Sequence, residues 1–143
     1  MMAELESLRT VIAEELGADE LVLFMVGFDG MLATTSERPW VPSGGRLDLA
    51  HFPAFEGVLR RGEPEQILLE HGSGATTGMG EIALLANSGY RSMLAVPVGG
   101  QALLHVLSEA ERPWGRAATN RALVIAYQLK PVIASLTAHA PAA

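Results

Sequence analysis

Few side chains in this 143-residue sequence are suited to chemistry, and they are scattered along it. There is no cysteine, which excludes disulfides, thiolate catalysis, Cys-ligated metals and thioether-linked cofactors. His51, His71 and His105 are possible metal ligands, but none has a partner at metal-ligand spacing, and most lone histidines are not ligands. No Ser/His/Asp set or pair of carboxylates emerges either. We therefore predict no catalytic residue, no metal site, no haem and no enzyme activity.

Two charged side chains lie next to apolar runs and have more than one possible role. Glu81 follows Gly78 by three residues at a predicted helix start, which favours a capping role; a buried acid beside a ligand is the alternative. Arg91 directly precedes an apolar run that reads as a strand. Its guanidinium either ties down a carboxylate or a helix C-terminus, or it pairs with an anionic ligand.

Composition limits the classes of partner. The formal net charge is −6 and Arg60-Arg61 is the only basic pair, so neither nucleic acid nor an anionic membrane is expected as a partner. Hydrophobic residues make up 49% of the sequence, yet no run reaches the length of a spanning helix. The first residues lack the apolar region of a signal peptide. We expect one cytoplasmic domain over residues 1–143, with its core at about 4–136 and a tail at 137–143.

Hydrophobic spacing predicts alternating helices and short hairpin strands. Met79, Ile82, Leu85 and Ala86 are expected to form the apolar side of the helix near Gly78, and Pro131 to kink or break the last helix. The two hairpins favour an antiparallel sheet in an α+β fold. Helices are predicted at 3–16, 52–61, 78–88 and from about 114, strands at 21–26, 31–36, 67–69, 92–98 and 101–107, and loops at 37–50 and 72–78, the second reading as a lid.

Gly99-Gly100 predicts a two-residue type I′ hairpin turn, in which both positions need positive φ. This turn would pair Val98 with Gln101 and so fix which side chains share a face. Met93, Ala95, Leu104 and Val106 would then lie on one face, and Leu94, Val96, Leu103 and His105 on the other. Pro97 has no N–H to donate, so the short outer strand at 67–69 is expected to end before reaching it.

Three segments together resemble the GAF domain family. They are LGADELVLFMV, HFPAFEGVLRRGEPEQIL and GYRSMLAVPVGGQALLHVLSEAERPW, and the likeness covers residues 5–135. The resemblance implies a profilin-like central antiparallel sheet of five to six strands, with the terminal helices on one face. Shorter helices and loops would cover a pocket on the other face. Members of this family are sensory and regulatory modules that bind small molecules, and many serve as dimerisation units.

The resemblance also indicates which residues face such a pocket, although a core that simply fills this space would use the same residue types. Departures from family patterns leave the ligand unknown. Covalent bilin attachment and the family's methionine sulfoxide reductase chemistry both need cysteine, and the Asn-Lys…Phe…Asp-Glu pattern of cyclic-nucleotide-binding members is absent. The candidate ligand-binding residues are Val22, Phe24, Phe55, Glu81, Leu84, Leu85, Met93, Ala95, Leu104 and Val106.

Three functions are compatible with the sequence. The first is a non-enzymatic sensory domain with a small-molecule pocket, signalling through its terminal helices. The second is a ligand-free interaction module, a homodimer through stripes on the terminal helices. The third and more distant is a roadblock-type α/β interaction protein, which a five-stranded sheet would favour. The helical stripes are Leu5, Leu8, Ile12 and Leu16 in the first helix and Ala122, Ile125 and Leu129 in the last.

Overall fold

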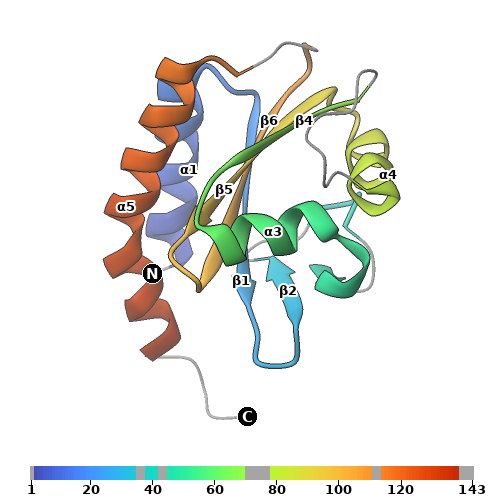
Figure 1. Cartoon of the computed structure of the whole chain (residues 1–143). Helices are drawn as coiled ribbons and strands as arrows, with labels where there is room; N and C mark the ends of the chain where they lie inside the picture. Colours follow the sequence, from blue (N-terminus) through green and yellow to red (C-terminus); the bar gives the residue numbers. More distant parts are fainter. Residues whose placement is uncertain (1, 35–37, 42–44, 70–77, 111–113, 139–143) are drawn as a thin grey trace.

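The computed structural model describes residues 2–34, 38–41, 45–69, 78–110 and 114–138. Within these ranges the strands form one antiparallel sheet of six strands in the order β3-β2-β1-β6-β5-β4 (Figure 1). The elements in chain order are α1 (Met2–Leu16), β1 (Glu20–Val26), β2 (Met31–Thr34), β3 (Arg46–Asp48), the 3-10 helix η1 (Leu49–His51), α3 (Pro53–Arg61), β4 (Glu65–Leu68), α4 (Met79–Ser88), β5 (Ser92–Val98), β6 (Ala102–Ser108) and α5 (Arg116–Ala138).

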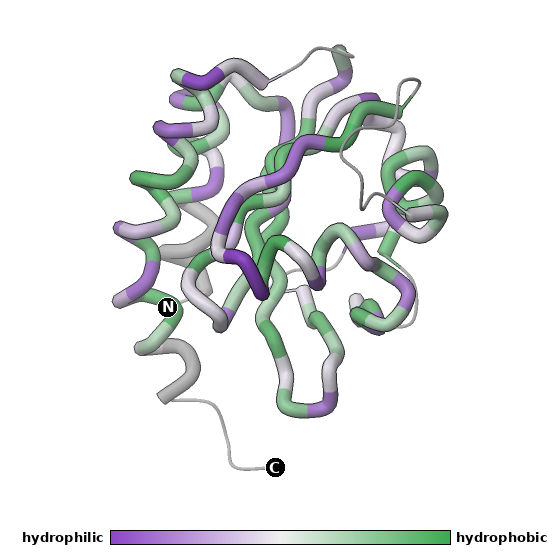
Figure 2. The backbone as a smooth tube through the Cα atoms, viewed as in Figure 1, coloured by the Kyte–Doolittle hydropathy of each residue, from purple (hydrophilic) through white to green (hydrophobic). Residues whose placement is uncertain are grey.

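The sheet separates two hydrophobic layers. Helices α1 and α5 cover one face, and α3 and α4 lie on the other (Figure 1). Successive strand side chains point to opposite faces, so each central strand supplies both layers. Leu94 and Val96 of β5 pack toward α1 and α5, whereas Met93 and Ala95 pack toward α3 and α4. This explains why all of β5 and β6 is buried, and Figure 2 shows the hydrophobic colouring of these strands.

The predicted stripes on the terminal helices are used inside the domain. Ile12 and Leu16 of α1, and Ala122, Ile125 and Leu129 of α5, are buried in the layer against the sheet. Leu8 remains 39% exposed, and the side chain of Leu5 lies outside the described part. The residues predicted to form a dimer bundle therefore pack mostly on their own sheet.

The prediction for Pro131 was a kink or a break, and the break is wrong because helix α5 continues past this residue. Proline removes one backbone donor and costs a helix interior roughly 3 kcal/mol. Ile133 lies beyond the proline and is fully buried in the layer against the sheet. Burying such a side chain contributes about 1.5–3 kcal/mol, which offsets the cost and explains why the helix continues.

The β5–β6 turn contains one residue more than predicted. Val98 pairs with Ala102, which leaves a three-residue loop of Gly99, Gly100 and Gln101. Of the two glycines only Gly99 has positive φ, so the type I′ prediction is wrong. The carbonyl of Gln101 instead accepts the amide hydrogen of Val26 at the end of β1, with 2.9 Å from nitrogen to oxygen.

This extra residue exchanges the two faces of β6. Leu104 and Val106 belong to the layer under α1 and α5, not to the predicted pocket face. Leu103 and His105 lie on the α3 and α4 side instead. A one-residue shift of register reverses every side chain of a strand, so one wrong turn length explains all four errors.

The sequence predicts the strand at one edge of the sheet but not the strand at the other edge. Strand β4 is an edge strand and pairs with β5 only from Ser92 to Ala95, so it stops short of Pro97 as predicted. Strand β3, at the other edge, lies where the sequence predicts a loop. It has only three residues and belongs to a segment rich in proline and glycine, where periodicity gives no signal.

Helix α4 starts after Gly78 as predicted, but its apolar side differs. Leu84 and Leu85 are buried and Ile82 is half-buried. Met79 is 86% exposed and Ala86 is also exposed, so these two do not face the core. The predicted lid at 72–78 lies outside the described residues except for Gly78.

A candidate ligand-binding face

Eight of the ten predicted pocket residues gather on the α3 and α4 side of the sheet. Seven are buried apolar side chains, and Glu81 of α4 lies with them. Leu104 and Val106 are the two that do not, because of the register described above. The prediction missed Leu103, His105 and Leu107 on this face. The group on this face comprises Val22, Phe24, Phe55, Glu81, Leu84, Leu85, Met93 and Ala95.

Glu81 joins the starts of two helices. Its Oε1 accepts the amide hydrogen of Ala54 in the first turn of α3 at 2.8 Å, and that of Gly78 at 3.0 Å. A carboxylate is favourable here because helix N-termini carry unsatisfied amides and partial positive charge. The predicted capping role is thus present, and the same side chain is fully buried, as the alternative role required.

Two glycines allow this junction to close. A methyl group on Gly80 would overlap the carbonyl oxygen of His51, and one on Gly78 would lie 2.7 Å from Cγ of Pro53. Side chains at these two positions would separate α4 from the start of α3. Glycine at both positions therefore brings Glu81 within reach of Ala54.

The second carboxylate oxygen of Glu81 is buried without a hydrogen-bond partner in the described part of the chain. Burial raises the pKa of this carboxyl above its ordinary value of 4.5, and the amides of Ala54 and Gly78 oppose that rise. A buried acceptor without a partner costs free energy, on the order of 1–3 kcal/mol. Such an atom is a natural contact for a ligand that carries an N–H or O–H donor.

His105 is the second buried polar group on this face. Its ring lies between those of Phe24 and Phe55, with centroids 4.6 Å and 4.5 Å away. Its Nε2 also has no hydrogen-bond partner among the described residues. Burial lowers its pKa from 6.5 to about 3, so the imidazole is neutral near pH 7.

The face is closely packed around these two groups. Phe55 and Ala95 are completely buried, and Phe52 stacks on Phe55 with ring centroids 5.2 Å apart. The small side chain of Ala95 leaves no exposed surface, because its neighbours cover it. A ligand on this face would therefore have to displace α3 or α4, or the aromatic side chains beneath them.

The other charged candidates lie apart from this face. His51 is exposed, with Nε2 3.9 Å from a carboxylate oxygen of Asp48, and His71 lies outside the described residues. The side chain of Arg91 is exposed at the start of β5. In the ranges that the structure describes, no group of three or more His, Cys, Asp or Glu side chains is arranged to hold a metal ion.

Comparison with solved structures shows that the fold of this chain is similar to that of GAF domains. The GAF domain/HD domain protein from Geobacter sulfurreducens is 15% identical, with a TM-score of 0.71 over 96% of this chain and 94% of that one. A phycocyanobilin-bound GAF domain from a cyanobacterial phytochrome is 16% identical, with a TM-score of 0.69 over 93% and 86%. The GAF domain of an Acinetobacter phosphoenolpyruvate-protein phosphotransferase is 19% identical, with a TM-score of 0.66 over 95% and 83%.

These likenesses establish the fold, which is that of a GAF domain, as the three sequence segments predicted. No family profile matches the sequence. No curated protein matches it either. The six strands of the described sheet do not meet the five-strand condition that would have favoured a roadblock-type protein. None of the described helices has the length and apolar character needed to cross a membrane.

Proposed function

We propose that this protein is a sensory or regulatory domain that binds a small molecule between α3, α4 and the sheet. The observation that supports this most directly is a pair of buried atoms, Glu81 Oε2 and His105 Nε2, on one otherwise apolar face, neither of which has a hydrogen-bond partner among the described residues. Apolar walls with a few polar groups are typical of ligand sites. The phycocyanobilin-bound relative of the same fold adds support, because that protein carries a ligand.

The polar and aromatic groups on this face limit the chemical class of ligand that can bind there. Glu81 Oε2 would accept a hydrogen bond from an N–H or O–H group, and Phe24, Phe52 and Phe55 would contact a planar or apolar body. The sequence contains no thiol, so attachment through cysteine is excluded. A ligand that favours a displaced α3 or α4 would alter strands β5 and β6, which also support α5 on the opposite face.

A thermal-shift screen tests this proposal. Nucleotides, bilins, haem and a general metabolite set are added to the protein, and a ligand at 100 times its Kd is expected to stabilise it by about 2.7 kcal/mol. Glu81→Gln replaces one carboxylate oxygen by a donor, so it should weaken the binding of a donor ligand by about tenfold or more. Val124→Ala, at an exposed position of α5, is the matched control. If no compound raises the Tm, or if Glu81→Gln binds as tightly, the proposed site is wrong.

A second candidate function is homodimerisation through the terminal helices. Val11 of α1 is 59% exposed, and Val124 and Tyr127 of α5 are 56% and 73% exposed. Arg121 Nη1 and Glu15 Oε1, 2.7 Å apart, tie these two helices together. Exposed apolar side chains on neighbouring helices are typical of an interaction surface.

Sedimentation at micromolar concentration tests this alternative. A dimer is expected for the wild type and a monomer for the double variant Val11→Glu/Val124→Glu, since burying two carboxylates in an interface is costly. Ala83→Glu, on the exposed side of α4, is the control. A wild-type protein that stays monomeric at every concentration would exclude the dimer.

A further inference from the structure

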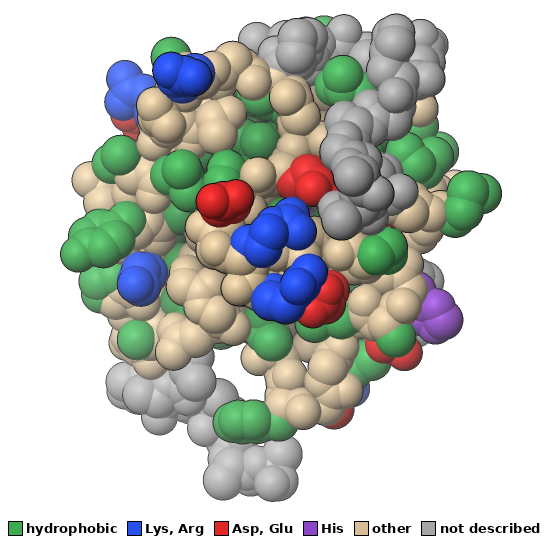
Figure 3. Space-filling model, viewed as in Figure 1, with side chains coloured by type: hydrophobic (Ala, Val, Ile, Leu, Met, Phe, Trp, Pro, Cys, Tyr) green, Lys and Arg blue, Asp and Glu red, His purple; other side chains and the backbone are tan. Residues whose placement is uncertain are grey.

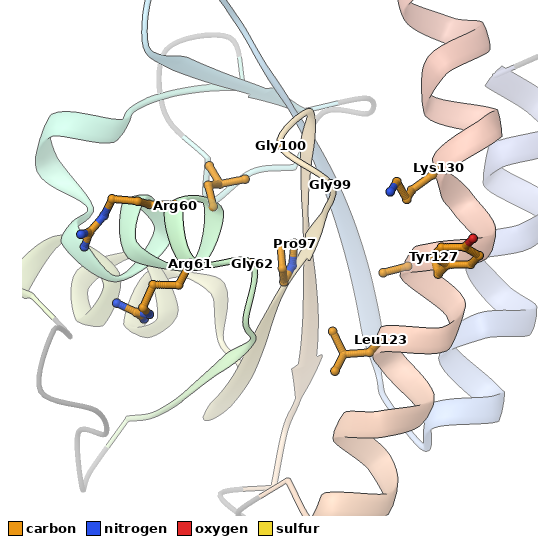
Figure 4. Close-up of a pocket in the computed structure, with 11 residues that line it drawn as sticks. Arg60, Arg61, Gly62, Pro97, Gly99, Gly100, Leu123, Tyr127 and Lys130 are labelled. Atoms are coloured by element: carbon orange, nitrogen blue, oxygen red, sulfur yellow. The ribbon is translucent and has the colours of Figure 1, made fainter.

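We propose that the groove between α3, the β5–β6 turn and α5 is a docking site for an acidic peptide segment of a partner protein. This groove (Figure 4) has a volume of about 400 Å³, and neither Glu81 nor His105 lines it. It lies at the end of β5 that β4 does not cover, next to Pro97. The last turn of α3 forms one wall and residues 123–130 of α5 the other.

The charge of the groove is opposite to that of the whole chain. The sequence has 16 acidic and 10 basic residues, yet the described residues that line the groove include Arg60, Arg61 and Lys130 and no acidic side chain. Figure 2 shows the end of α3 and the start of β4 as strongly hydrophilic, and Figure 3 shows basic side chains with acidic neighbours over this region. A basic groove on an acidic protein selects an anionic partner.

Lys130 is the cation best placed to bind. It is the only lysine of the sequence, its side chain is exposed, and its ammonium lies 5.5 Å from the ring centroid of Tyr127. No carboxylate in the described part of the chain pairs with it within 4.0 Å. Arg60 and Arg61, by contrast, lie 3.4 Å from Glu56 and Glu65 respectively. Lys130 therefore provides a charge that no carboxylate of the described residues neutralises.

The spread of the charges favours a peptide over a small anion. In Figure 4 the Arg60 and Arg61 side chains extend away from α5, whereas Lys130 extends toward the turn from the opposite wall. Because the basic side chains of the two walls point in different directions, a segment of several residues is better suited to contact both walls than one phosphate or carboxylate. The exposed ring of Tyr127 and the side-chain-free surface of Gly99 and Gly100 would contact its apolar and backbone parts.

Occupation of this groove would connect the two layers of the domain. Helix α3 packs on one face of the sheet and α5 on the other. A segment that contacts the ends of both helices would stabilise one arrangement of α5 relative to the sheet. The groove would thus give a partner protein access to the helix through which the proposed sensory function operates.

Fluorescence anisotropy and NMR together test the proposal. The probe is a fluorescein-labelled decapeptide of alternating Glu and Leu, with matched peptides carrying Gln or Lys in place of Glu. Only the Glu peptide is expected to bind, with an affinity that falls as salt rises. Lys130→Gln should weaken it by about two- to fivefold and Lys130→Glu by about tenfold or more.

Arg121→Gln is the matched control, because Arg121 is exposed on the same helix, is paired with Glu15 and does not line the groove. It should leave the affinity unchanged. Amide shifts in the bound wild type should centre on Gly99, Gly100 and residues 123–130. Equal binding of the Gln peptide, equal effects of Lys130→Gln and Arg121→Gln, amide shifts centred elsewhere, or equally tight binding of free glutamate or anionic lipid vesicles would each overturn the proposal.

Discussion

Two polar side chains, Glu81 and His105, decide the chemistry of the face under α3 and α4. Both are buried among aliphatic and aromatic residues, and each has one atom without a hydrogen-bond partner in the described part. Buried polar groups of this kind lower stability and usually persist for a reason such as binding. Their protonation gives a direct way to detect that cost.

The pH dependence of stability is expected to reveal His105. Its pKa is 6.5 in the unfolded chain and about 3 in the fold, so below pH 6.5 the unfolded state binds a proton that the folded state excludes. Stability is therefore fully present above pH 6.5 and falls as the pH is lowered toward 3. Between pH 6 and 4 the wild type should lose about 1.4 kcal/mol per pH unit more than His105→Phe, measured by urea unfolding.

The titration of Glu81 changes the stability with pH in the opposite direction to that of His105, so the two contributions are measured separately. Its pKa is raised in the fold, so its contribution is fully present below pH 4.5 and is lost as the pH rises through the folded value. The His105 difference is therefore measured in both the wild-type and the Glu81→Gln backgrounds. Parallel pH profiles for the wild type and His105→Phe would show that His105 titrates normally.

At the scale of elements, helices with a long hydrophobic periodicity were predicted correctly. The faces of β6 were predicted wrongly because they depend on the length of one turn. The stripe through Ile12 and Leu16 located α1. Helices α3 and α4 end at Arg61 and Ser88 as predicted, and each is followed by a glycine with positive φ. The face of β6 depended on whether Gln101 belongs to the turn. That choice is settled by a tertiary contact, the hydrogen bond to Val26, which a local pattern does not contain.

The junction of α3 and α4 gives a sharp test of element packing. Gly80→Ala places a methyl group against the backbone of His51, so α4 must move. A loss of about 1–3 kcal/mol is expected in chemical denaturation, despite the better helix propensity of alanine. Gly115→Ala is the control because a methyl group at that position would have nothing within 4 Å of it among the described residues. Equal stability of the two variants would show that the junction is loosely packed.

The part of α5 beyond Pro131 is expected to contribute to stability. Ile133→Ala removes a fully buried side chain and should cost about 2–5 kcal/mol in the free energy of unfolding. Val124→Ala on the exposed side of the same helix should change it by less than about 0.5 kcal/mol. A small loss of stability in Ile133→Ala would mean that the part of α5 beyond Pro131 contributes little to the free energy of unfolding.

For the whole molecule, the order of helices and strands was enough to predict the fold. Whether the interior contains a cavity was not predictable from the sequence. Three dispersed segments and their spacing indicated a GAF domain, and the solved structures agree. Whether the small side chain of Ala95 leaves a cavity depends on how the other side chains of this layer, Phe55 and Leu85 among them, fill the space. Those contacts join residues far apart in the chain, beyond the reach of hydrophobic patterns.

The shared sheet predicts that both layers unfold together. Trp114 is buried in the layer of α1 and α5, and Trp40 packs against the layer of α3 and α4, with its ring 5.8 Å from that of Tyr90. Trp40→Phe and Trp114→Phe each leave one tryptophan as a reporter. Their fluorescence midpoints in urea should coincide with that of circular dichroism for each variant. Separate midpoints would show that the layers unfold independently.

The length of the β5–β6 loop decides which residue numbers of β5 and β6 lie on the same face of the sheet. Because the loop length is odd, residue-number parity is the same on both strands: Met93 and Ala95, and Leu103, His105 and Leu107, all odd, lie toward α3 and α4. Substitutions at the odd positions of β5 and β6 should therefore disturb the layer of α3 and α4, and those at the even positions the layer of α1 and α5, in the same phase on both strands. A sequence alignment that opens or closes a one-residue gap at Gln101 would invert that phase and assign every β6 position to the wrong side.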